Sequence, residues 1–133
     1  MQDINHFAVF AAALSTFLIG GLWYSPAMFY KAWVKANGFG EDIAKKGNTP
    51  MIFIVSFILS LVMAYNLAFF IAGPETTMGW AISAALLAGF GWAALSLAIV
   101  ALFERRPASY ILINGGYITV SFTVMGLILG LWR

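Results

Sequence analysis

The sequence predicts an all-α integral membrane protein with four transmembrane helices and a short interfacial amphipathic helix after the first. Of its 133 residues, 62% are hydrophobic and 9% are charged, whereas an average soluble domain has about 25% charged and about 45–50% apolar residues. Four continuous apolar stretches lack Asp, Glu, Lys and Arg in their interiors. A helix of about 20 residues crosses a hydrocarbon layer roughly 30 Å thick. Stretches of this length favour helices over barrel strands, which are about half as long.

The four predicted spans form a single domain over 1–133, and they cover about 4–24, 50–72, 78–103 and 109–132. Pro50 follows Thr49 at the start of the second span, where proline is tolerated in the first helical turn. The links 73–77 and 104–108 are short, so consecutive helices are predicted to be antiparallel neighbours. The first span has no basic residue before it, which favours a retained helix over a cleaved signal peptide.

The connection 25–49 is predicted to contain the interfacial helix. Ser25-Pro26 is expected to start this helix, with Pro26 in its first turn. Its apolar residues fall at helical spacing, Lys31 and Lys35 lie on another face, and Gly38 supplies a stop. This pattern is typical of a helix lying in the membrane interface.

Lys and Arg residues predict the orientation. Six of the seven lie in the first and third connections: Lys31, Lys35, Lys45, Lys46, Arg105 and Arg106. The seventh is Arg133. By the positive-inside rule both connections are cytoplasmic and both termini extracytoplasmic. The net charge of +2 comes from basic residues in connections beside apolar spans. This position is typical of membrane topology, so no nucleic-acid partner is expected.

Three stretches carry a resemblance to a known family: GLWYSPAMFYKAW at 21–33, FERRP at 103–107, and INGGY with MGLILGLW across 113–132. In this order they resemble the small bacterial membrane proteins known as domain of unknown function 1761. The resemblance implies a four-helix membrane domain in the bacterial inner membrane, and it implies no activity.

One group of polar and aromatic residues is expected at the cytoplasmic end, where the first span ends and the fourth begins. A buried amide needs a partner, so Asn114 is expected to contact the end of the first span or a ligand. A small polar site here would take a headgroup, an anion or a small solute. The alternative is an interfacial aromatic belt with Asn114 bonded to a neighbouring helix. The candidate residues are Trp23, Tyr24, Ser25, Arg105, Asn114 and Tyr117.

A second candidate group lies near the opposite end, where His6 starts the first span and Tyr65 and Asn66 approach the end of the second. A lone histidine can act as a haem ligand or proton acceptor. A single histidine cannot supply two ligands within one chain, so an interfacial histidine in water is the favoured interpretation.

Small residues at i, i+4 spacing predict close helix packing. In the fourth span Gly126 and Gly130 form a GxxxG. Such stripes also run along the first span at Ala12, Thr16 and Gly20, and along the second at Ser56, Ser60, Ala64 and Ala68. This GxxxG is the best candidate for a contact between subunits. In the third span, Gly89 and Gly91 allow a bend, with packing the favoured alternative.

Several chemistries are disfavoured by residues the chain lacks. It has no cysteine and one histidine, and none of its five carboxylates lies inside a span. Proton-coupled carriers usually depend on a membrane-embedded ionisable group, and neither a catalytic set nor a metal cluster is evident. We therefore expect no enzyme activity, no cofactor and no metal site.

Two functions remain from the sequence. The first is a non-catalytic transport or channel-type subunit that acts as a homo-oligomer, because four helices alone can hardly enclose a pathway. The second is an accessory or lipid-interacting protein that stabilises a larger complex. Membrane lipid is an expected partner in both functions. The sequence does not indicate a protein partner.

Overall fold

The computed structural model describes residues 4–40, 43, 49–71, 73 and 75–132. In this part of the chain, four helices are long and apolar enough to cross a membrane: His6–Trp23, Thr49–Ile71, Met78–Phe103 and Ala108–Leu131. These bounds confirm the four predicted spans to within two residues at each end. The chain is therefore a multi-pass, all-α membrane protein. Lys45 and Lys46 of the first connection lie outside the described residues.

The first helix, α1 (His6–Trp23), begins at an N-cap that satisfies its free backbone donors. The side chain of Asn5 accepts hydrogen bonds from the amides of Phe7 (3.0 Å) and Ala8 (3.2 Å). The first amides of a helix have no partner within it, so an Asn in this position stabilises the start.

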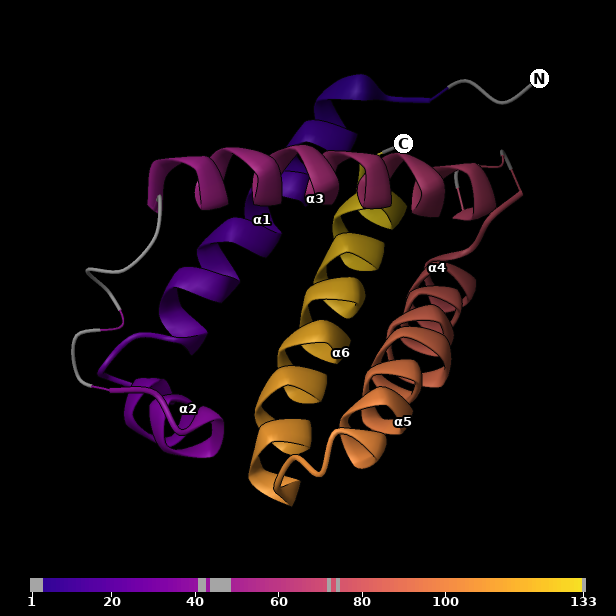
Figure 1. Ribbon diagram of the computed structural model, residues 1–133. Coiled ribbons are helices and arrows are strands. Elements are labelled where there is room, and N and C mark those ends of the chain that lie inside the picture. The colour runs from indigo at the N-terminus through magenta and orange to yellow at the C-terminus, as the bar shows by residue number, and fades with distance from the viewer. Residues whose placement is uncertain (1–3, 41–42, 44–48, 72, 74, 133) are drawn as a thin grey trace.

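The last helix, α6 (Ala108–Leu131), lies between α1 and the third span (Figure 1). Residues close to each other on α1 and α6 run in opposite order, because Trp23 bonds to Ile113 and Asn5 bonds to Trp132. The two helices are thus antiparallel along their whole lengths. The Asn5 side-chain amide donates to the Trp132 carbonyl at 3.4 Å, so the two ends of the described chain lie together.

The third span consists of α4 (Met78–Leu86), the π-helical segment η2 (Leu87–Ala94) and α5 (Leu95–Phe103). A side chain at Gly89 would not fit, since an added Cβ would lie 2.5 Å from Cβ of Phe122 on α6. Gly91 has open space around its Cα. Packing therefore explains Gly89, and the widened turn around it is a local π-helix.

The GxxxG of α6 faces α4 of the same chain, which corrects the prediction that it forms a subunit contact. A Cβ at Gly126 would overlap Cβ of Ala85 and lie 3.0 Å from the Ala81 carbonyl oxygen, and one at Gly130 would lie 2.9 Å from Cβ of Ala81. Both glycines are buried. A small-residue motif permits close approach of a helix without specifying which one, and here the partner is α4.

The second span, α3 (Thr49–Ile71), packs against α1. Three aromatic pairs show that the two helices run in opposite directions: His6 with Tyr65, Phe10 with Phe57, and Phe17 with Phe53. In Figure 1, α3 runs horizontally, whereas α1, α6 and the third span run roughly from top to bottom. From Phe53 onward α3 keeps ring contacts with α1, so only its first turn lies beyond them. The four helices do not form a simple parallel-sided bundle.

The short helix after α1 is α2 (Tyr30–Asn37), four residues shorter than predicted at its start. Residues 26–29 form turns, in which the Ser25 carbonyl accepts from the amides of Met28 (2.9 Å) and Tyr30 (3.2 Å). Pro26 thus lies in a turn that precedes the helix. Two other predicted features of the helix are confirmed, since Lys31 and Lys35 are exposed and Gly38 caps the helix with a φ of 70°.

Candidate binding groove and the polar cluster beside it

The end of α1 is fastened to the start of α6 by the Trp23 indole. Its Nε1 donates to the Ile113 carbonyl oxygen at 2.9 Å. The ring lies so close to α6 that a Cβ at Gly116 would be 2.9 Å from its Cζ2 atom. Gly116 therefore makes room for the indole, and the predicted contact between these two helix ends is confirmed.

Asn114 has a partner on another helix, as its position in a span requires. The Tyr24 hydroxyl donates to Oδ1 of Asn114 at 2.6 Å, and Nδ2 of Asn114 donates to the Tyr110 carbonyl at 3.0 Å. Burial, and then the neighbouring hydroxyls of Tyr117 and Tyr110, raise the pKa of the Tyr24 hydroxyl. Tyr24 therefore stays protonated and acts as the donor.

Tyr117 continues this cluster one turn deeper along α6. Its hydroxyl donates to the Thr16 carbonyl at 3.2 Å, and its ring meets the Tyr24 ring edge-to-face with centroids 5.4 Å apart. A Cβ at Gly20 would lie 3.3 Å from the Tyr117 ring. Trp23, Tyr24, Asn114 and Tyr117 form what we call the inner cluster.

Arg105 and Ser25, also predicted here, are not bonded to the inner cluster. Arg105 is exposed and has a φ of 63°, because it takes the left-handed position that ends α5, with its amide bonded to the Leu102 carbonyl. The neighbouring Arg106 instead lies over the Tyr110 ring at 5.2 Å. The Ser25 hydroxyl donates locally to the Leu22 carbonyl at 2.7 Å.

The second predicted group is brought together only in part. His6 Nδ1 and the Tyr65 hydroxyl are 2.7 Å apart, which joins α1 to α3 at the end opposite α2. Asn66 is exposed and takes no part in this bond. Within the described residues, no three His, Asp or Glu side chains come together as a metal site would require.

A groove of about 690 Å³ opens between the C-terminal half of α1 and the N-terminal turns of α3, and we call it the α1–α3 groove. One face of each helix forms its walls. From α1 they are Thr16, Phe17, Gly20, Gly21 and Tyr24, and from α3 they are Thr49, Ile52, Phe53, Ser56 and Ser60. The inner cluster supplies two of the groove's rings, since Tyr117 also lines it.

Aromatic side chains line the α2 end of the groove. Trp33 of α2 meets Tyr24 edge-to-face at 5.9 Å, and Phe39 meets Trp33 in the same way at 5.2 Å. Tyr30 lies 6.1 Å from Trp33. These rings join α2 to the inner cluster, so α2 is part of the groove.

Sequence reasoning identified Tyr24 and Tyr117 but missed the groove itself. Thr16, Gly20, Ser56 and Ser60 were predicted to be packing residues, because small residues at i, i+4 spacing usually are. Thr16 and Ser60 are buried, whereas Ser56 is exposed in the groove. The sequence feature that could have indicated the groove is the hydroxyl of Ser56, which lies on a small-residue stripe close to the predicted interfacial helix.

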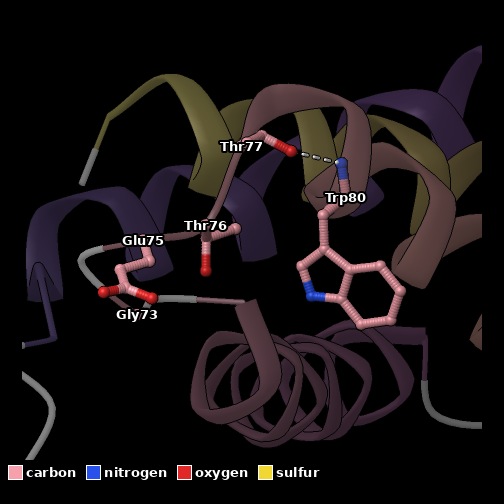
Figure 2. Close-up of a pocket in the computed structure, with 5 residues that line it drawn as sticks. All are labelled: Gly73, Glu75, Thr76, Thr77 and Trp80. Atoms are coloured by element: carbon pink, nitrogen blue, oxygen red, sulfur yellow. Dashed lines mark hydrogen bonds between the residues drawn. The ribbon is translucent and has the colours of Figure 1, made fainter.

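A second cavity of about 600 Å³ lies at the other end of the protein, around the link between α3 and α4. The Thr77 side chain caps α4 by accepting from the Trp80 amide at 3.1 Å (Figure 2). Glu75 and the Trp80 ring lie on opposite sides of this cavity in Figure 2. Their side chains do not converge, and the α1–α3 groove is the better candidate site.

Comparison with known proteins agrees with this architecture. No curated protein and no solved structure matches the chain. The family described as "Protein of unknown function (DUF1761)" has a model that matches residues 7–130, from the first turn of α1 to the last turn of α6. This match covers nearly the whole chain, and the protein therefore belongs to the DUF1761 family of unknown function.

Proposed function

We propose that this protein is a non-catalytic, lipid-interacting membrane protein that holds one amphipathic molecule in the α1–α3 groove. The observation that carries the proposal is the groove's size and lining. Its volume of about 690 Å³ falls in the range of small-molecule sites, which are usually apolar clefts with a few polar groups. Here the walls are mostly aromatic and aliphatic, and hydroxyls supply the polar groups.

The position of the groove beside α2 also supports an amphipathic ligand. One face of α2 contributes Tyr30 and Trp33 to the groove, and Lys31 and Lys35 are exposed. An amphipathic helix of this kind lies at the membrane surface. A ligand would thus keep its polar end near α2 and extend its apolar part between α1 and α3. With the basic connections in the cytoplasm, the site would face the inner leaflet of the bacterial inner membrane.

Two matched glycine variants test the proposal. Gly21 lines the groove, and a Cβ there meets no atom within 4 Å, so Gly21→Leu fills the groove without a backbone clash. Gly91 on η2 is equally open but does not line the groove, and Gly91→Leu is the control. The two variants and the wild type are purified from membranes. The amount of each amphiphile per protein in their organic extracts is then measured by mass spectrometry.

The wild type and Gly91→Leu should retain the same amphiphile in a fixed ratio to protein, and Gly21→Leu should lose it. Equal retention by all three proteins would contradict the proposal. Ser56→Trp fills the groove from α3 and serves as a second test, with circular dichroism and elution volume used to check that each variant is folded.

The second candidate is a homo-oligomeric transport or channel-type subunit. It is favoured by the hydroxyl-bearing residues along the groove, among them Thr16, Ser56 and Tyr117. A solute path formed by several copies would use such groups. Light scattering in detergent tests this candidate first, because a monomeric mass would contradict it. Solute release from vesicles by wild type but not by Gly21→Leu would support it.

A further inference from the structure

The α1–α3 groove has no charged side chain among its described lining residues. The lysines of α2 are exposed and do not line it. Burying an unpaired charge in an apolar site is costly. The part of a ligand that enters the groove is therefore uncharged, which disfavours a phosphate, a carboxylate or an ammonium group inside it.

Aromatic rings dominate the groove. They belong to seven of the fifteen lining residues, whereas aromatic residues make up 17% of the chain. Phe17 and Phe53 meet with centroids 5.9 Å apart where α1 and α3 come together, and Trp33 and Phe39 meet near α2. Contacts between rings gain energy beyond the area they bury. A flat ring is thus a better complement to these walls than an acyl chain alone.

Three hydroxyls in the groove are available to a ligand. The Tyr24 and Tyr117 hydroxyls already donate to Asn114 and to Thr16. Within the part of the chain that the structure describes, the hydroxyls of Tyr30, Thr49 and Ser56 make no hydrogen bond. They come from different walls, α2 and α3. A ligand with two oxygen acceptors on a ring would satisfy Tyr30 on α2 and one hydroxyl on α3.

We propose that the groove binds an uncharged amphiphile with a flat, carbonyl-bearing ring and an apolar tail, the chemistry of a lipid-soluble quinone, with Tyr30 and Ser56 as hydrogen-bond donors. This inference rests on the proposed function and specifies its ligand class. It concerns binding alone and includes no electron transfer.

The test titrates a benzoquinone with a ten-carbon chain into the full-length protein in phosphatidylcholine nanodiscs. Quinones quench tryptophan fluorescence, and Trp33 lines the groove. Quenching should saturate in the wild type and in Gly91→Leu, and its apparent affinity should fall at least tenfold in Gly21→Leu. Ser56→Ala and Tyr30→Phe should each weaken binding about fivefold, the effect of losing one hydrogen bond.

Two further controls locate the quinone. Trp33→Phe should remove the saturable quenching, whereas Trp92→Phe should keep it, because Trp92 is exposed on η2 and does not line the groove. Ten-carbon chains that end in a carboxylate or a trimethylammonium group should not displace the quinone.

Displacement of the quinone by either charged ten-carbon chain would overturn the inference. Equal quenching in Gly21→Leu and the wild type would overturn it as well. If Gly21→Leu loses its co-purified amphiphile but quinone quenching is unchanged, the ligand class is wrong and the proposed function stands. If neither measurement responds to Gly21→Leu, both fail.

Discussion

The Tyr24 hydroxyl and Oδ1 of Asn114 are 2.6 Å apart, and this hydrogen bond joins positions 90 residues apart in the chain. It ties the C-cap of α1 to the second turn of α6. The bond satisfies the amide oxygen within a membrane span, where an unpaired polar group costs several kcal/mol. It also places the Tyr24 ring where α1, α2 and α6 meet, in the wall of the α1–α3 groove.

Replacing Tyr24 by Phe should destabilise the protein by about 1–3 kcal/mol, because the ring remains while Oδ1 of Asn114 is left without a donor. Unfolding in mixed micelles measures this change. A double-mutant cycle with Asn114→Leu should give a coupling energy of about 1 kcal/mol, near the upper range seen between membrane helices. Tyr110→Phe is the control, and it should be neutral because its ring still supports Arg106. No coupling between Tyr24 and Asn114 would show that the bond is unimportant.

The close packing of α6 on α4 predicts that Gly126→Ala is destabilising even though alanine favours helix. An added Cβ meets Ala85 and the Ala81 carbonyl, and overpacking of this kind costs about 1–3 kcal/mol. Gly91→Ala, which meets nothing within 4 Å, should be neutral or slightly stabilising. Thermal unfolding in detergent compares the two. If Gly126→Ala instead changes only the oligomeric mass, the glycine serves a subunit contact.

The absence of cysteine from the chain allows a direct test of the register between η2 and α6. A Cβ at Gly115 would lie 3.7 Å from Cβ of Ala94, which matches the separation of about 3.5–4.5 Å in disulfides. The double variant Ala94→Cys, Gly115→Cys should therefore form an intramolecular disulfide under mild oxidation. Gly91→Cys with Gly115→Cys should not, since a Cβ at Gly91 meets nothing within 4 Å. Equal disulfide yield in the two pairs would contradict this register.

The charge pattern predicts the orientation of the chain in the membrane. A reporter fused after Arg133 should read as extracytoplasmic, and one inserted near Gly40 as cytoplasmic, because basic residues concentrate in the connections next to α2 and α6. The hydrogen bond between Asn5 and Trp132 places the two ends of the described chain together. An N-terminal reporter should therefore agree with the C-terminal one, and opposite readings from the two termini would contradict this fold.

The spans and the contact at the inner cluster could be predicted because both depend on features visible along one chain. Apolar length fixes each span, and the positions of Tyr24 and Asn114 near adjoining span ends fix their depth. The start of α2 could not be predicted from Pro26, because the Ser25 carbonyl accepts two amides in turns that delay the helix until Tyr30.

The groove could not be predicted because it depends on the course of α3. That helix is apolar on all sides, with buried residues mainly in its C-terminal half, so its sequence does not indicate how it lies against α1. The partner of Gly126 was hidden for a similar reason, since a small residue permits approach by any helix. Gly89 lies in the π-helical segment and packs against Phe122 of α6, a neighbour that the sequence does not indicate.

The most direct test of the binding groove is an electron cryo-microscopy map of the wild-type protein in nanodiscs, with a bound antibody fragment to aid alignment. We expect an open groove between the C-terminal half of α1 and the N-terminal turns of α3, with elongated density in it whose wider end lies beside Tyr30 and Ser56. A map in which α3 stays against α1 along its full length, with the groove closed and no added density, would contradict the account.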